Sequence, residues 1–262
     1  MNEELREKIL NAVSSTVLYG TIISDAYTFE EREKISDALK KVCDKQSYYS
    51  FDCCGVYFYW DYYTKEILYI GLTNNLTRRF NEHNGILEKK TGNKYQKIKK
   101  YFTEKEKIGF SVLVQSPMEA KNPYSPSKDE EVAVIEGSFI EGHKLKYSSK
   151  PIWNDIGGSR SGRSDINLKR YAIKIFDSIS LKKINDFNAK STLREIANSD
   201  EILKNESNLH AFRMLMYKYD ESFETAKKIL LTPNPFFPQS SFVISELEEL
   251  LKSIYMNKKL VI

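Results

Sequence analysis

Two short tyrosine-containing strings constrain the fold of this chain more than any other feature. They are Gly-Val-Tyr at residues 55–57 and Tyr-Ile-Gly at residues 69–71, and their tyrosines stand twelve residues apart. The segments around them, 54–60 and 66–71, are rich in Tyr, Ile, Val and Phe, which favour β-strands. Five residues, Asp-Tyr-Tyr-Thr-Lys, separate the two segments. The pattern predicts a β-hairpin.

A helix is expected immediately after this hairpin, over about residues 75–88. Asn74 or Asn75 can cap its first turn. Arg79 and His83 are four residues apart, so both side chains lie on one face of the helix. Arg78 is about 100° further round the helix and should point elsewhere.

The remaining chain is predicted to be mostly helical, with one further strand. Residues 3–18 and 28–48 have helical character, and the run from Phe110 to Gln115 reads as a strand. A helix is expected over about 128–143, because Ser127 and Glu130 form a capping-box pattern. A turn-rich stretch from Ile152 to Arg163 follows, and after it three helical stretches are expected: 169–190, 192–231 and 241–256.

The two strings, together with the arginine and histidine after them, resemble the GIY-YIG nuclease family. Arg79 lies eight residues after Gly71, which is the spacing of the family's arginine. Val56 replaces the family's isoleucine, a conservative change. The resemblance covers about residues 55–157. It implies an α+β fold: a small three-stranded antiparallel sheet flanked by helices, on which a DNA phosphodiester bond is cleaved with the help of a metal ion.

We expect three parts of the chain on this basis: a helical N-terminal extension at 1–50, the GIY-YIG nuclease core at 51–157, and a mostly helical C-terminal extension at 158–262 that contacts DNA or a second subunit. The sequence contains no internal repeat, long low-complexity tract or clear flexible linker. The C-terminal extension is therefore expected to pack on the core.

The resemblance assigns roles to four residues of the hairpin and the helix after it. Tyr57 matches the tyrosine that takes the proton of the attacking water, which requires a nearby cation or a hydrogen-bonded base because a tyrosine pKa is normally about 10. Tyr69 is expected to position water or phosphate. Arg79 matches the arginine that stabilises charge on the phosphate. His83 matches a histidine that relays protons or holds the tyrosine in place.

Two further catalytic residues are expected outside the hairpin. Glu136 matches the family's glutamate that binds a single divalent cation, Mg²⁺ or Mn²⁺. Its apolar neighbours support this independently, since a carboxylate in an apolar helix segment is costly unless it is paired or coordinated. Asn154 matches the family's last asparagine and is expected to brace the site, although a turn-forming role before Asp155 and Gly157 explains it equally well.

Basic residues in two segments are candidates for DNA contact. Eight lysines occur between residues 89 and 107, and lysines near a phosphate backbone provide sequence-independent affinity. Those expected to bind DNA are Lys89, Lys90, Lys94, Lys97, Lys99 and Lys100; a solvated helix face is the alternative. Arg160 and Arg163 lie in a Gly/Arg-rich stretch and are candidates for reading guanine edges.

Composition excludes other classes of protein. The net charge of +4 is too small to indicate nucleic-acid binding alone, and no run approaches the 18 apolar residues of a membrane span. Three cysteines, Cys43, Cys53 and Cys54, form no CxxC set. They suit a reducing cytoplasm, and the N-terminus has no signal-peptide pattern.

Three functions are compatible with these observations. The first is a type II restriction endonuclease, a Mg²⁺-dependent, sequence-specific double-stranded DNA endonuclease acting as a homodimer or higher homo-oligomer. The second is a homing or DNA-repair endonuclease, in which a linker usually joins the nuclease core to a separate binding domain. The third is a catalytically silent DNA-binding protein, against which the intact set of candidate residues argues.

Overall fold

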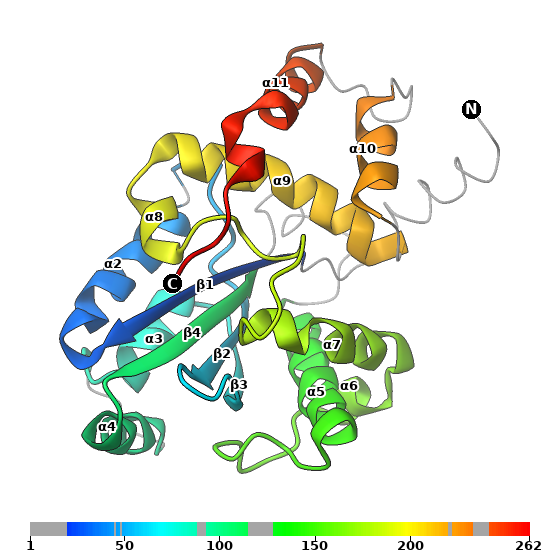
Figure 1. Cartoon of the computed structure of the whole chain (residues 1–262). Coiled ribbons are helices and arrows are strands. Elements are labelled where there is room, and N and C mark those ends of the chain that lie inside the picture. The colour runs from blue at the N-terminus through cyan, green and yellow to red at the C-terminus, as the bar shows by residue number, and fades with distance from the viewer. Residues whose placement is uncertain are drawn as a thin grey trace.

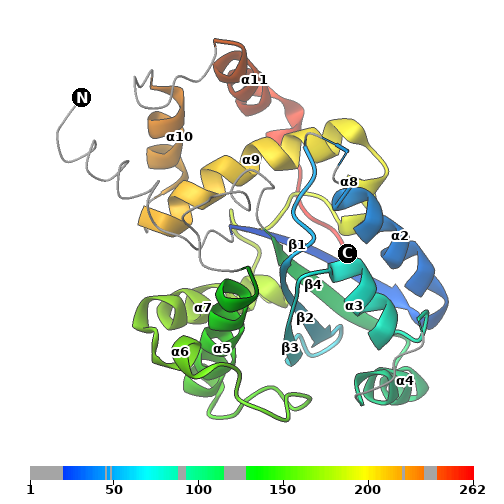
Figure 2. The same cartoon turned by 180° about the vertical axis from the view of Figure 1, so that it is seen from behind.

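The structure is a computed structural model that describes residues 20–44, 46–47, 49–87, 93–114, 128–219, 222–232 and 241–262. The helix expected at 3–18 and the cap expected at Ser127 lie outside these residues. The described chain forms one antiparallel sheet with helices on both faces and a group of helices across one end (Figures 1 and 2). The predicted α+β class is confirmed.

Four strands make up the sheet: β1 (Thr21–Thr28), β2 (Gly55–Asp61), β3 (Ile67–Thr73) and β4 (Lys107–Val114). Their order is β1-β4-β2-β3, so β1 and β3 are the two edges. The hairpin predicted around the two tyrosine strings is β2–β3, in which Tyr57 lies opposite Gly71 and Tyr59 lies opposite Tyr69. The third expected strand is β4, which pairs with β2.

The expected three-stranded sheet is extended by β1, which comes from the segment expected to be helical. All eight residues of β1 pair with β4, from Thr21 opposite Val114 to Thr28 opposite Lys107. The helix expected over 28–48 is correspondingly shorter: a 3₁₀ turn, η1 (Phe29–Glu31), leads into α2 (Arg32–Val42). The sheet therefore includes a strand that precedes the expected core boundary at residue 51, while the proposed division into three parts stays a prediction.

One face of the sheet is covered by helices from the N-terminal half and by one short later helix. They are α2, α3 (Leu76–His83), α4 (Lys94–Glu104) and α8 (Leu193–Ala197). Tyr57, Tyr59 and Phe110 point to this face and form a buried cluster with residues of these helices, such as Phe80 and Leu193. The lysine-rich stretch thus contains a real helix, α4, whose Ile98 and Tyr101 are buried beneath the lysines.

The opposite face carries three packed helices: α5 (Lys128–Tyr147), α6 (Arg160–Ser164) and α7 (Ile166–Ile179). Phe58 and Val56 of β2 point to this face and pack in one cluster with Phe139 of α5 and Phe176 of α7. Since strand side chains alternate between faces, the tyrosines of β2 and its apolar Val and Phe serve different sides of the sheet.

The C-terminal helices continue the second cluster across one end of the sheet. They are α9 (Asp200–Tyr219), α10 (Phe223–Leu231) and α11 (Ser241–Lys252), followed by the 3₁₀ turn η3 (Ile254–Asn257). Phe212, Ala226 and Leu247 share one buried cluster with Phe58 of the sheet. The described C-terminal region is therefore packed on the core, as expected. Within the described residues, no helix combines the length and apolar character needed to cross a membrane.

Candidate active site

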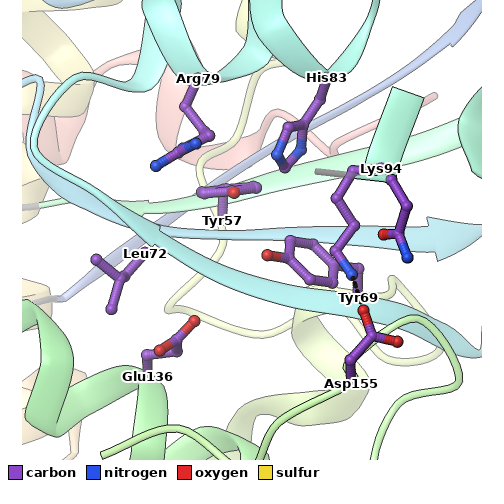
Figure 3. Close-up of a pocket in the computed structure, with 9 residues that line it drawn as sticks. Tyr57, Tyr69, Leu72, Arg79, His83, Lys94, Glu136 and Asp155 are labelled. Carbon is purple, nitrogen blue, oxygen red and sulfur yellow. Dashed lines mark hydrogen bonds and ion pairs between the residues drawn. The ribbon is translucent and has the colours of Figure 1, made fainter. Parts of the chain in front are cut away.

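A cavity of about 520 Å³ lies at the β3 edge of the sheet, between α3 and α4 on one side and α5 on the other (Figure 3). Five of the six predicted catalytic residues line it, together with one predicted DNA-binding lysine; these six are Tyr57, Tyr69, Arg79, His83, Glu136 and Lys94. Leu72, Asn93 and Asp155 complete the lining. Asn154 does not line the cavity.

The pairing of the two strings places both tyrosines on one face. Because Tyr57 lies opposite Gly71, its side chain is diagonal to that of Tyr69 on the neighbouring strand. A Cβ atom at position 71 would come within 2.5 Å of the Tyr57 hydroxyl oxygen and 2.6 Å of the Tyr69 ring. Position 71 must therefore be glycine for the phenol of Tyr57 to lie across β3 and reach the cavity.

Tyr57, Tyr69 and His83 form a triangle of aromatic rings. The ring centroids of Tyr57 and Tyr69 are 5.8 Å apart, and those of Tyr57 and His83 are 5.6 Å apart. The two tyrosine side chains are close enough for each to affect the pKa of the other. Burial raises the Tyr57 pKa well above its usual value, the neighbouring tyrosines add to the effect, and Arg79 opposes it. Tyr57 is consequently a neutral phenol in this state.

Arg79 reaches the cavity from α3 and is held by an acidic residue of the same helix. Asn75 caps the helix by accepting a hydrogen bond from the Arg78 backbone N–H, as the sequence predicts. Arg79 Nη1 donates to Glu82 Oε2 at 2.9 Å, and Arg78 Nε donates to Glu82 Oε1 at 3.1 Å. Arg79 is therefore both a cavity residue and a member of an ion pair, while Arg78 does not line the cavity.

Glu136 reaches the same cavity from α5, a helix on the other face of the sheet. This is possible because β3 is an edge strand, so a side chain can pass around it. Burial raises the Glu136 pKa to about 7, against the lowering effects of the nearby backbone N–H of Leu72 in β3 and of Arg79.

The site suits a single hard cation. Among the described residues, no group of three or more His, Cys, Asp or Glu side chains gathers as a metal cage. Glu136 nevertheless places a mostly buried carboxylate at the cavity wall, where its negative charge is costly without a cation. Mg²⁺ is commonly bound through one or two carboxylates, with water and substrate phosphate filling the other positions. The donor set fits that pattern, and Glu136 is the side chain that would hold the cation.

Asn154 lies beside the cavity and braces the edge strand. Its Oδ1 accepts from Ile70 N at 2.9 Å, and its Nδ2 donates to Ile70 O at 2.7 Å. The preceding Trp153 N donates to Leu68 O at 2.9 Å. The loop therefore satisfies the outer hydrogen-bonding groups of β3 much as another strand would. This geometry gives Asn154 a positioning part, the bracing that the resemblance implies.

Lys94 and Lys97 converge on one aspartate at the rim. Lys94 Nζ is 3.1 Å from Asp155 Oδ2, and Lys97 Nζ is 3.1 Å from Asp155 Oδ1. Lys94 Nζ also lies 4.8 Å from the Tyr69 ring centroid. The two lysines lower the Asp155 pKa to about 2, while burial lowers the Lys94 pKa. Sequence reasoning missed Asp155; its position next to Asn154 is the one signal that points to it.

The other predicted DNA-binding residues lie away from the cavity or outside the described residues. Lys99 and Lys100 are exposed on α4, and Lys89 and Lys90 fall in a segment that the structure does not describe. Arg160 is exposed at the start of α6, whereas Arg163 Nη1 donates to Gly158 O at 2.6 Å.

The Gly/Arg-rich stretch also has a packing role. A Cβ atom at Gly162 would lie 2.0 Å from Val134 O, so this glycine permits α6 to lie directly on α5. The stretch is thereby attached to the helix that carries Glu136.

A comparison with known proteins agrees with the geometry of this site. The family model described as the GIY-YIG catalytic domain matches residues 53–113, which include β2, β3, α3, α4 and most of β4. No curated protein and no solved structure matches the chain. A domain of this family indicates a nuclease. Residues 53–113 are thus similar to the GIY-YIG catalytic domain, and this similarity supports a relation to the GIY-YIG nuclease superfamily.

Proposed function

We propose that the protein is a Mg²⁺-dependent, sequence-specific endonuclease of the type II restriction class that hydrolyses double-stranded DNA. One observation carries the proposal: a single cavity holds a buried carboxylate, an arginine and two tyrosines, contributed by both faces of the sheet. These groups together can support phosphodiester hydrolysis, which combines an attacking water, a negatively charged transition state and a leaving oxygen.

Each side chain has a distinct part in the proposed reaction. Tyr57 receives the proton of the water whose oxygen bonds to phosphorus, and Tyr69 and His83 hold Tyr57 in position. Arg79 donates hydrogen bonds to the phosphate oxygens as the bond to the 3′ oxygen breaks. Glu136 would hold the divalent cation, which would supply positive charge to stabilise the phosphate and the leaving oxygen.

The state of Tyr57 sets a condition on this mechanism. Its pKa in the protein is well above the usual value because the phenol is buried. It acts as a base only where positive charge near its hydroxyl outweighs the cost of burial. Arg79 supplies part of that charge, since it is the cation that lowers the Tyr57 pKa.

The restriction role is supported by the way the extensions are attached. Phe176 and Phe212 of the C-terminal region share a buried cluster with Phe58 of the nuclease sheet. A homing or repair enzyme that joins a separate binding domain through a linker does not need this packing. Cutting both strands with one cavity per chain requires a dimer or sequential nicking, and we propose a homodimer. All three cysteines are thiols, which suits the cytoplasm.

The test is cleavage of long, unmodified plasmid or phage DNA with Mg²⁺ or Mn²⁺, read as fragments on a gel. We expect discrete bands, and no cleavage by Glu136→Ala. Glu141→Ala is the matched control, because Glu141 lies on the same helix, pairs with Lys144 and does not line the cavity. It should cleave like the wild type.

Other outcomes separate the alternatives. A smear or a single nick favours a repair or structure-directed nuclease. Intact DNA at every metal concentration, with binding retained, supports a silent DNA-binding protein or a rare-site homing enzyme. Cleavage by Glu136→Ala at near the wild-type rate rejects the assigned site. Tyr57→Phe should bind DNA normally and lose about a hundredfold or more in rate.

A further inference from the structure

We infer that Asp155 occupies a phosphate-binding position in the DNA-free protein, and that a backbone phosphate of bound DNA displaces its carboxylate from Lys94 and Lys97. The inference rests on the proposed function and adds a second phosphate subsite, at the rim of the cavity, together with the residue that restricts access to it. The ligand is a DNA phosphodiester.

The geometry of the three side chains is that of a bound anion between two cations. One carboxylate oxygen of Asp155 contacts Lys94 Nζ and the other contacts Lys97 Nζ, each at 3.1 Å. Lys94 and Lys97 are one turn apart on α4, so both ammonium groups face the same way. A phosphate also presents two oxygens to a pair of cations, and Asp155 therefore resembles it in charge and in shape.

The Asp155 side chain is more exposed to solvent than the two lysines, so the carboxylate is the group that can leave the ion pairs. The side chains of Lys94 and Lys97 are 13% and 25% exposed, whereas that of Asp155 is 61% exposed. Asp155 can rotate into solvent without disturbing a buried contact. The two ammonium groups remain close together and partly desolvated, so they favour an incoming anion.

Other contacts hold the lysines and the loop in place without Asp155. Lys94 Nζ donates to Trp153 O at 2.5 Å, Lys97 Nζ donates to the same oxygen at 3.3 Å, and Lys94 also lies against the Tyr69 ring. The loop itself is anchored by the hydrogen bonds of Trp153 and Asn154 to β3. Loss of the Asp155 carboxylate should therefore leave the subsite formed.

The ion pair of Arg79, another residue that lines the cavity, has a less exposed carboxylate. Arg79 pairs with Glu82, whose side chain is only 13% exposed and also contacts Arg78. That carboxylate is covered and serves to position the arginine. Asp155 is the more exposed of the two acids, so Glu82 is suited to hold its cation and Asp155 is suited to leave.

The experiment measures binding of a fluorescent, mixed-sequence duplex of about 20 base pairs in EDTA, at salt concentrations from about 0.05 to 0.3 M. We expect Asp155→Asn to bind about three- to tenfold more tightly than the wild type, with a slope of log affinity against log salt that is steeper by about one. The reason is that the wild-type protein must release its own anion before it binds a phosphate.

Asp177→Asn is the matched control for the change of net charge. Asp177 lies on α7, is partly exposed and pairs with Lys146 at 3.0 Å, away from the cavity. Its substitution should change the affinity less than about twofold. In a Lys94→Gln, Lys97→Gln background, Asp155→Asn should bring no gain, because the subsite is then missing. Asp155→Ser is a second variant, and thermal unfolding checks that each variant is folded.

The outcomes distinguish the two proposals. If the wild type binds and cleaves DNA but Asp155→Asn and Asp155→Ser bind no more tightly than Asp177→Asn, the inference is wrong and the proposed function stands. A gain that persists in the lysine double variant also rejects it, since the effect is then general electrostatics. If no variant binds DNA, both the inference and the proposed function fail.

Discussion

The two edges of the sheet are both covered, but by different chemistry. At the β1 edge, Ile22 N donates to Phe187 O and Ala189 N donates to Ile22 O, each at 2.8 Å. At the β3 edge, Trp153 and Asn154 form hydrogen bonds with the outward-facing backbone groups of Leu68 and Ile70. In each case a loop from later in the chain forms the hydrogen bonds that a neighbouring strand would form. The two edges differ in how the buried charged side chains near these loops are paired.

Buried charges at the β1 edge are fully compensated. Glu206 is 0% exposed and accepts hydrogen bonds from Arg213, from the Lys190 backbone N–H and from the Tyr255 hydroxyl, at 2.6–2.7 Å. Arg213 also donates to Asn188 O at 3.0 Å.

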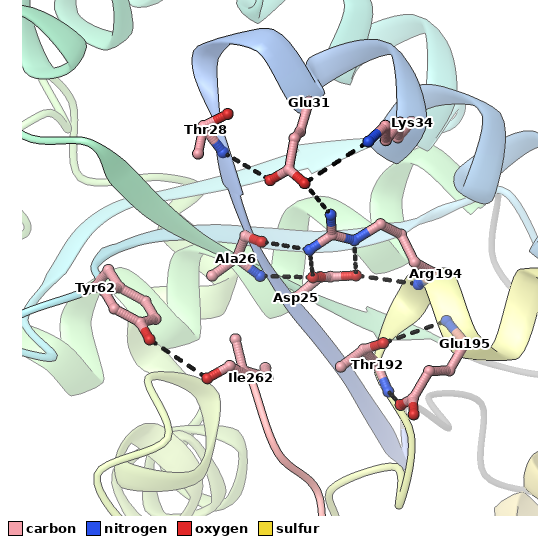
Figure 4. A network of polar contacts seen from close by, with 10 residues as sticks. All are labelled: Asp25, Ala26, Thr28, Glu31, Lys34, Tyr62, Thr192, Arg194, Glu195 and Ile262. Carbon is pink, nitrogen blue, oxygen red and sulfur yellow. Dashed lines mark hydrogen bonds and ion pairs between the residues drawn. The ribbon is translucent and has the colours of Figure 1, made fainter.

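A second compensated pair holds α8 against the same strand. Asp25 is 1% exposed and receives a two-point contact from the Arg194 guanidinium, which also binds Glu31 (Figure 4). Arg194 thereby links α8 to β1, and Arg213 Nη1 links α9 to the same strand through Thr21 Oγ1 at 3.4 Å.

The β3 edge leaves its buried charge poorly compensated. Glu136 has a pKa raised to about 7 because burial outweighs the stabilising contacts. Tyr57, which lines the same cavity, also has a raised pKa, and burial is again the largest cause. The comparison indicates that the β1 edge is organised for stability, and that the β3 edge retains an energetic cost which a bound cation and phosphate can relieve.

The largest effect is expected at the β1 edge. Arg213→Met should reduce the free energy of unfolding by about 3–5 kcal/mol, because it leaves Glu206 buried without its cation. Urea unfolding measures this loss. Cleavage per folded molecule should not change, since Arg213 does not line the cavity.

Replacing both partners provides the control. Arg213→Met combined with Glu206→Leu should recover much of the stability, because no buried charge remains. A loss of cleavage that exceeds the unfolded fraction would mean that the two edges are coupled.

A smaller effect of opposite sign is expected for Glu136→Gln. The folded pKa of about 7 lies above the usual glutamate value of 4.5, so the folded state binds the proton more tightly than the unfolded state does. Stability of the wild type should fall as pH rises from about 4.5 to 7 and then level off. In EDTA at pH 8, Glu136→Gln should be more stable by about 1–3 kcal/mol and should not cleave DNA after metal is added.

The pH dependence of metal binding follows from the same titration. Mn²⁺ should bind more weakly by about tenfold for each pH unit below about 7, because the proton competes for the carboxylate. Thermal shift with added metal reads this without cleavage. A Glu136→Gln protein that is less stable than wild type at pH 8 would show that the carboxylate is compensated after all.

The smallest change in stability is expected for substitution of two asparagines, one at each edge of the sheet. Asn154→Ala should cost about 1–2 kcal/mol through the lost contacts with Ile70, and cleavage should fall beyond the loss of folded protein. Asn188→Ala, which loses a hydrogen bond to Ser178 O, should cost a similar amount without affecting cleavage per folded molecule. Equal effects on cleavage would remove the functional distinction between the edges.

Local sequence patterns allowed the hairpin and the helix that follows it to be predicted. β2, β3 and α3 lie where the sequence indicated, within a few residues. β1, which contains the buried Asp25, was missed because residues 1–50 were expected to form a helical extension. That carboxylate is tolerated because Arg194, 169 residues away, pairs with it. No local pattern contains this information.

The candidate site also combines relations that local sequence determines with others that depend on tertiary packing. Strand alternation puts Tyr69 and Gly71 on one face, and helical spacing puts Arg79 and His83 together, so these relations follow from the order of residues. The register of the β2–β3 hairpin then places Tyr57 on the same face as Tyr69. Glu136 and Asp155 come to the cavity only because α5 and the loop after it pack around the open edge of β3. Contacts between segments so distant in the chain depend on how whole elements pack, and only the folded structure specifies them.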